Sequence, residues 1–76
     1  MDKRTVRRYL TEIKRSTLEH YNGHLKLLSK MRGVECLIPY YDDLLSLCKI
    51  QEHFIQNLDT VITRLIQEEK AGVDHE

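Results

Sequence analysis

Apolar residues recur along residues 3–31 at the spacing of one helical face. On a wheel of about 100° per residue, charged side chains such as Arg8, Glu12 and Lys26 fall on the opposite side. This pattern predicts an amphipathic helix from about residue 3 to residue 31, with Gly33 at a left-handed C-terminal cap. The apolar stripe contains Val6, Leu10, Ile13, Tyr21, Leu28 and Met31, with Leu18 and Leu25 at its edge.

A second helix is predicted over about residues 40–70, because Pro39 is favoured at a helix start and Gly72 follows the last periodic residue. Its apolar arc covers roughly 180°, whereas a surface helix needs about 100°. One neighbouring helix cannot cover both rows of this arc. The first row is Leu44, Cys48, Ile55, Leu58, Ile62 and Leu65, and the second is Leu47, Ile50, Phe54 and Val61.

The charge of the chain divides between its two halves. Residues 1–32 hold nine Lys and Arg against three Asp and Glu, a net charge of +6, and residues 33–76 hold three against nine, a net charge of −6. If the helices pair antiparallel across the connector 32–39, residue i meets roughly residue 72 minus i. This register places Arg7 and Arg8 beside Glu68 and Glu69, and places Lys30 and Arg32 near Asp42 and Asp43.

These observations predict an all-α fold, a single antiparallel two-helix hairpin over residues 1–76 with a frayed tail at 71–76. A chain this short buries little surface, so we expect a partner or dimerisation to complete the hairpin. The connector is apolar where connectors are usually polar, which predicts that a partner chain or a second copy covers it. Tyr40 and Tyr41 fit either an interface anchor or a staple that closes the hairpin end.

No motif indicates catalysis, a cofactor or a bound metal. His20 and His24 are four residues apart, and the register brings His24 near Cys48, but there is no HExxH, paired CxxC or Gly-rich phosphate loop. We therefore expect no enzymatic activity and no small-molecule substrate. Without a signal peptide or a long apolar run, the sequence predicts a cytoplasmic protein with Cys36 and Cys48 reduced and no membrane insertion.

The size and pattern of the chain resemble the small helical-hairpin co-chaperones of bacterial type III secretion, the YscE-like subunits. The resemblance implies that the hairpin docks on a larger helical-repeat chaperone, and that the pair keeps the needle subunit monomeric until export. No specific motif carries the resemblance, so no functional residue is transferred. Phage and plasmid regulators that dimerise into four-helix bundles share the same pattern.

The leading hypothesis is a non-enzymatic protein-interaction module, whose partner is another protein or a second copy. Its predicted partner-binding residues are Leu47, Ile50, Phe54 and Val61, with Leu37, Ile38, Tyr40 and Tyr41 of the connector region. The alternative is a homodimeric regulator that binds nucleic acid through a basic first helix, at Arg4, Arg7, Arg8 and Arg15. The zero net charge adds nothing in favour of the alternative.

Overall fold

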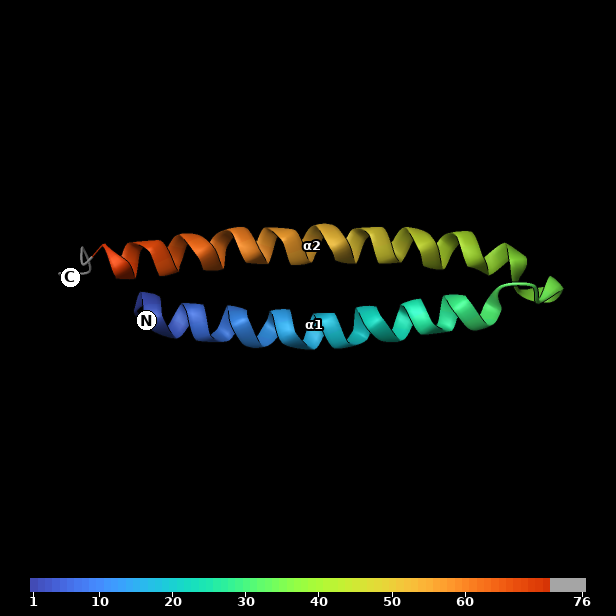
Figure 1. The fold of residues 1–76 in the computed structure, drawn as a ribbon, viewed down its shortest axis with the longest axis horizontal. Helices are drawn as coiled ribbons and strands as arrows, with labels where there is room; N and C mark the ends of the chain where they lie inside the picture. Colours follow the sequence, from blue (N-terminus) through green and yellow to red (C-terminus); the bar gives the residue numbers. More distant parts are fainter. Residues whose placement is uncertain (72–76) are drawn as a thin grey trace.

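Two long helices lie side by side and antiparallel in the computed structural model, which describes residues 1–71 (Figure 1). Helix α1 runs from Lys3 to Met31, and helix α2 runs from Ile38 to Lys70. A short 3₁₀ helix, η1, spans Glu35–Leu37 between them. The fold is therefore the predicted all-α helical hairpin, drawn out to 59 Å along its longest axis.

Both ends of α1 follow from local sequence. Asp2 caps its start, where the carboxylate Oδ1 accepts a hydrogen bond of 2.8 Å from the Thr5 backbone N–H. After Met31 the chain makes a turn closed by a 3.0 Å bond from the Val34 N–H to the Met31 carbonyl. Arg32 is extended (φ −60°, ψ 126°) and Gly33 has φ 84°, the dihedral pattern of a type II turn. The predicted left-handed residue at Gly33 is confirmed.

The second helix begins slightly earlier than the sequence predicts. The connector was expected to end at residue 39, but η1 leads directly into α2 at Ile38, and Pro39 lies in the first turn of α2. Proline is tolerated there because the first N–H groups of a helix have no intrahelical acceptor. At the other end, the Ala71 N–H donates to the Gln67 carbonyl at 3.0 Å. The predicted frayed tail spans residues 71–76, and the part beyond Ala71 lies outside the described residues.

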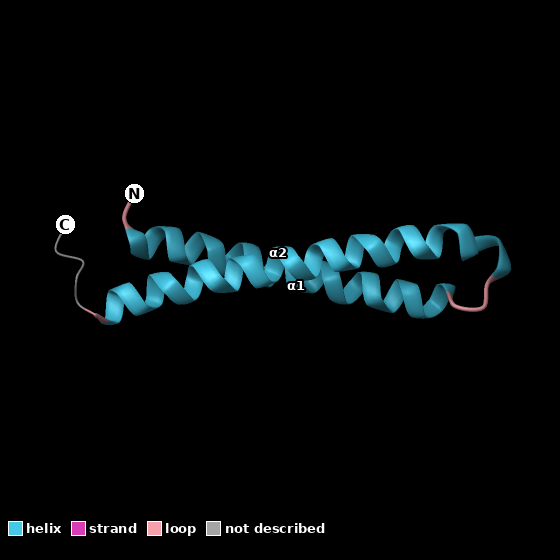
Figure 2. Cartoon of the chain, turned by 90° about the horizontal axis from the view of Figure 1, so that it is seen from above, coloured by secondary structure: helices cyan, strands magenta, loops and turns pink. Residues whose placement is uncertain are grey.

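The seam between the helices follows a seven-residue repeat. Seam positions alternate at intervals of three and four residues, as the a and d positions of a coiled coil do. Every one of these side chains is buried or half-buried, and Cys48 is the most buried. Figure 2 shows the corresponding shallow crossing of the two helices. The seam contains Leu10, Lys14, Thr17, Tyr21, His24, Leu28 and Met31 of α1, and Tyr41, Leu44, Cys48, Gln51, Ile55, Leu58, Ile62 and Leu65 of α2.

This repeat confirms the first apolar row of α2 and corrects the stripe expected on α1. Ile13 and Leu25 are exposed, whereas Lys14 and His24 lie in the seam. The difference arises because two supercoiled helices meet every 3.5 residues, so a wheel drawn at 3.6 residues per turn drifts by about 20° in each heptad. Only five side chains are buried within the described chain: Leu28, Met31, Cys48, Leu58 and Ile62.

Polar side chains complete the seam and fix its register. Arg7 Nε lies 2.6 Å from Glu69 Oε2, as the sequence predicted, while Lys3 Nζ lies 3.1 Å from Glu68 Oε1 and Arg8 is exposed. The cross-helix pairs join residues whose numbers add to between 71 and 76, close to the predicted 72. They are Lys3–Glu68, Arg7–Glu69, Lys14–Asp59, Tyr21–Glu52 and His24–Gln51. Within residues 1–71 no ion pair joins Lys30 or Arg32 to Asp42 or Asp43.

Candidate protein-interaction surface

One row of exposed apolar residues on α2 repeats at intervals of seven. Tyr40, Leu47, Phe54 and Val61 occupy the heptad position just before each seam residue Tyr41, Cys48, Ile55 and Ile62. Leu47 is 50% exposed, and Phe54 and Val61 are 45% exposed. The second apolar row predicted from the sequence is therefore uncovered in the hairpin.

Helix α1 contributes a matching row that the sequence reasoning missed. Ile13 and Leu27 precede the seam residues Lys14 and Leu28, so they hold the same heptad position as the α2 row, and both are exposed. In an antiparallel pair, rows at this same position lie on the same side of the seam. The pairs Lys14–Asp59 and Tyr21–Glu52 both add to 73, which places Ile13 level with Val61 and Leu27 level with Leu47.

These two rows together form the surface that we call the apolar face. It is defined by Ile13, Leu27, Tyr40, Leu47, Phe54 and Val61, with His20 between the two residues of α1. The His20 ring stays close to its own helix, with Nδ1 2.9 Å from the Ser16 carbonyl oxygen. The apolar face thus runs along much of the hairpin.

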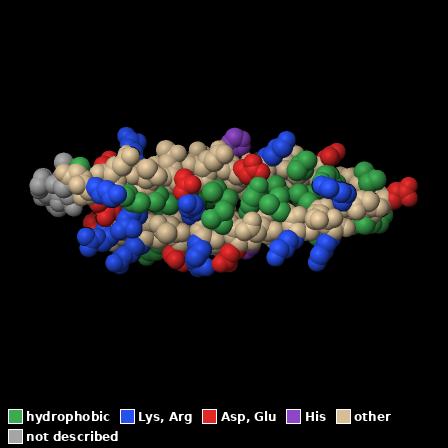
Figure 3. All heavy atoms as spheres, viewed as in Figure 1, with side chains coloured by type: hydrophobic (Ala, Val, Ile, Leu, Met, Phe, Trp, Pro, Cys, Tyr) green, Lys and Arg blue, Asp and Glu red, His purple; other side chains and the backbone are tan. Residues whose placement is uncertain are grey.

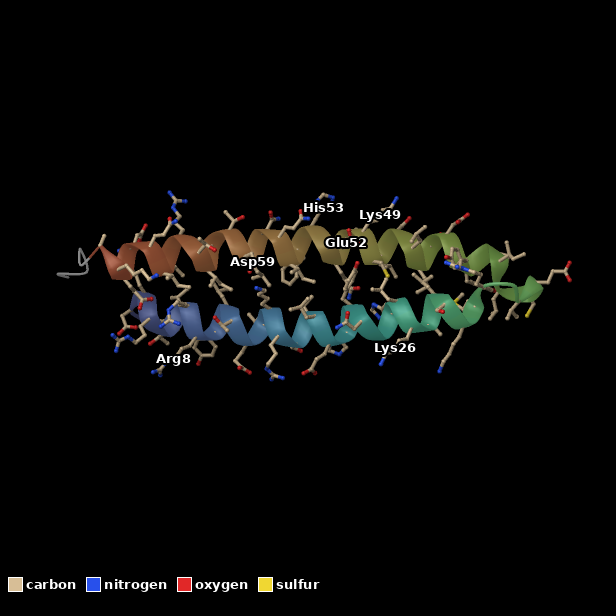
Figure 4. The ribbon with its side chains drawn as sticks, in the orientation of Figure 1. Arg8, Lys26, Lys49, Glu52, His53 and Asp59 are labelled. Carbon is tan, nitrogen blue, oxygen red and sulfur yellow. The ribbon has the colours of Figure 1, made fainter. Side chains whose placement is uncertain are left out.

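The opposite side of the seam has a different character, because polar pairs bridge it. Lys14 pairs with Asp59, and the Tyr21 hydroxyl donates to Glu52 Oε2 at 2.5 Å. This hydrogen bond to a carboxylate, together with desolvation, raises the pKa of Tyr21. Figure 4 places Asp59 and Glu52 on α2 along this side, and Figure 3 shows charged side chains interrupting its hydrophobic band. Leu25, Ile38, Leu45 and Ile66 are also exposed on this side, and within the α2 row Glu52 and Asp59 lie between Leu45 and Ile66.

Each edge of the apolar face carries one further exposed row, which we call an outer row. The outer row of α1 includes Gly23, where a Cβ atom would meet nothing within 4 Å. The outer row of α2 includes Ile50, which is 63% exposed and was predicted as partner-binding. The two outer rows are Tyr9, Ser16, Gly23 and Lys30 on α1, and Asp43, Ile50, Asn57 and Arg64 on α2.

The predicted connector residues do not gather on one surface. Tyr40 joins the apolar face, and Leu37 is half-buried. Ile38 and Tyr41 instead line a shallow hollow of about 290 Å³ together with Met31, Arg32, Gly33 and Asp42. The apolar connector therefore serves partly to close the end of the hairpin, and only part of it extends the apolar face.

The basic side chains expected to form a nucleic-acid face are dispersed. Arg7 is engaged by Glu69, and Arg15 pairs with Glu12 at 3.0 Å and with Glu19 at 2.8 Å. The Arg15 guanidinium lowers the pKa of Glu12, chiefly through its hydrogen bond. Arg4 and Arg8 remain on the solvent-exposed side of α1, which Figure 4 shows for Arg8. The nucleic-acid alternative stays a prediction, with two of its four arginines held by carboxylates.

The remaining chemical groups form no reactive cluster in the described part of the chain. His24 lies with Nδ1 2.8 Å from Gln51 Oε1, and Cys36 and Cys48 are both free cysteines. Among residues 1–71 no three His, Cys, Asp or Glu side chains come together as metal ligands. Neither helix is apolar enough over a sufficient length to cross a membrane. Comparison of the chain with protein families, curated proteins and solved structures finds no match.

Proposed function

We propose that this chain is a non-enzymatic protein-interaction module that binds a helical protein surface through the apolar face. The observation that carries the proposal is the alignment of exposed apolar rows from both helices on one side of the seam. Small soluble proteins rarely expose a continuous apolar surface unless it binds something.

The energetics of the hairpin support the same proposal. Only five side chains are buried in the described chain, and much of the α1 seam is polar. Chains of this size commonly need oligomerisation or another added constraint to be stable, because their cores are small. Covering the apolar face would supply the missing burial at about 25 cal/mol for each Å² removed from water.

The mode of binding that fits this face is helix against groove. Leu47, Ile50, Phe54 and Val61 project from adjacent faces of α2 at intervals of three, four and seven residues, the spacing of anchor residues in such complexes. A co-chaperone that docks on a larger helical chaperone would use the same anchors. That specific role stays a prediction of the resemblance.

The test compares two neighbouring ring-bearing residues of α2. Phe54→Glu places a charge in the apolar face, whereas His53→Glu changes a side chain that points away from α1 (Figure 4). Under dilute conditions we expect Phe54→Glu to abolish most binding of an apolar fluorescent dye, with helicity by circular dichroism unchanged. His53→Glu should leave both signals as in the parent chain. Equal dye binding by the parent and Phe54→Glu chains would refute the apolar face as a binding surface.

A further inference from the structure

We propose that the partner on the apolar face is a second copy of this chain, forming a four-helix bundle; this inference rests on the proposed function. The hairpin measures 59 Å by 17 Å across its two helices. A copy laid over that face would bury on the order of 1,000 Å² per protomer, above the ~800 Å² per partner of a standard interface. The area suffices for a stable dimer.

The register within the hairpin also specifies how two copies fit together. With the two-fold axis parallel to the helices, α1 of one copy lies antiparallel against α2 of the other. Residues whose numbers add to 73 then meet between copies, as Lys14–Asp59 and Tyr21–Glu52 do within one chain. The two outer rows come together level by level. The resulting contacts are Tyr9 with Arg64, Ser16 with Asn57, Gly23 with Ile50, and Lys30 with Asp43.

The contact between Gly23 and Ile50 gives a reason for a glycine inside a long helix. Gly23 has no positive φ, and nothing in the hairpin lies within 4 Å of where its Cβ would be. Glycine destabilises a helix relative to alanine, so neither turn geometry nor packing within the chain accounts for it. Among the described residues, Ile50 is, after Met1, the most exposed large apolar side chain. In the dimer, the side chain of Ile50 fills the notch left by Gly23 of the other copy.

Charge complementarity supports this arrangement. Lys30 and Asp43 have opposite charges, and Arg64 can lie over the ring of Tyr9 in a cation–π contact. Within residues 1–71 none of these three charged residues forms an ion pair in the isolated hairpin. A two-fold axis perpendicular to the helices would instead place Arg64 of one copy against Asp43 of the other. Lys30 would then lie near the start of the other copy's α1. Only the arrangement with the two-fold axis parallel to the helices places Ile50 of one copy over Gly23 of the other.

Charge reversal distinguishes the two orientations. The dissociation constant of the full chain is measured by sedimentation equilibrium with reducing agent present. We expect Lys30→Asp and Asp43→Lys each to weaken the dimer about tenfold, since each creates two like-charge contacts per dimer. Combining them should restore the parent value. The controls are Lys26→Asp and Asp42→Lys, made singly and together, which introduce the same charge changes away from the outer rows. They should leave the dissociation constant unchanged.

Gly23→Ala provides a second readout, in which two signals move in opposite directions. It should raise the helix stability of the monomer while weakening the dimer, because the added methyl group fills the notch. A dimer that tightens with Gly23→Ala, or a double reversal that fails to restore affinity, would overturn the arrangement. A chain that stays monomeric at all concentrations would overturn the second copy as partner. The dye test at Phe54 would then show whether the proposed function survives without it.

Discussion

Replacing leucine with alanine should reduce the free energy of unfolding by different amounts at Leu58 and at Leu47. Both are leucines within α2, but Leu58 is 8% exposed in the seam and Leu47 is 50% exposed on the apolar face. Leu58→Ala removes a buried side chain and leaves a cavity, which costs about 3 kcal/mol. Leu47→Ala loses only the buried half of its side chain, about 0.5–1 kcal/mol in the monomer. Leucine and alanine have similar helix propensities, so the backbone contributes little to the difference.

The assay is urea unfolding followed by circular dichroism at two protein concentrations about a hundredfold apart. Dimerisation makes the midpoint depend on concentration, because mass action favours the associated state. At the lower concentration we expect Leu58→Ala to lose about 2 kcal/mol more stability than Leu47→Ala. At the higher concentration Leu47→Ala should cost roughly 1 kcal/mol more per protomer than it does in the monomer. Equal losses at the lower concentration would refute the assignment of seam and apolar face.

Three further changes probe the turn, the register and the hydrogen bonding of the seam. Gly33→Ala should destabilise the hairpin by about 1–2 kcal/mol in urea unfolding, because φ is 84° at this residue. Gly23→Ala is the control, and it should slightly stabilise the monomer. A double-mutant cycle of Arg7→Ala and Glu69→Ala should give a coupling of about 0.5–1 kcal/mol that shrinks with salt, and zero coupling would contradict the 2.6 Å pair. In an ultraviolet titration, Tyr21 should ionise above the ordinary tyrosine pKa, and Tyr21→Phe should remove that step. Since the folded pKa is raised, this stabilisation is present below the unfolded tyrosine pKa of about 10 and is lost as the pH rises through the folded value.

Much of α2 could be predicted because its apolar residues outnumber the positions that one seam can bury. The row through Cys48, Leu58 and Ile62 is buried, and the row through Leu47 and Phe54 is exposed, as the width of the apolar arc implied. The turn at Gly33 also follows from sequence, because a positive φ is a backbone requirement that glycine meets. These features depend on local periodicity and local sterics, which a sequence contains directly.

Helix α1 was harder to predict because its seam is not defined by hydrophobicity. Lys14, Thr17 and His24 lie in the seam, while Ile13 and Leu27 face outward. A hydrophobic wheel places Ile13 in the apolar stripe, since it cannot weigh a lysine in the seam against an aspartate on a distant helix. The available signal was the fourteen-residue spacing of Ile13 and Leu27, matched to the seven-residue row of α2. Recognising it requires knowing which positions of α1 lie in the seam, which depends on tertiary contacts.

The polar seam of α1 and the exposed apolar face are two consequences of one distribution of residues. Lys14 and His24 take seam positions, and Arg7 lies one heptad before Lys14. Their partners on α2 are Asp59, Gln51 and Glu69. The opposite charges of the two halves are thereby partly used within the hairpin, where they set its register. Ile13 and Leu27 are consequently left beside the seam, on the same side as the α2 row. A sequence selected only for an isolated hairpin would place these apolar residues in the seam, and their outward position is the reason we propose that another chain completes the structure.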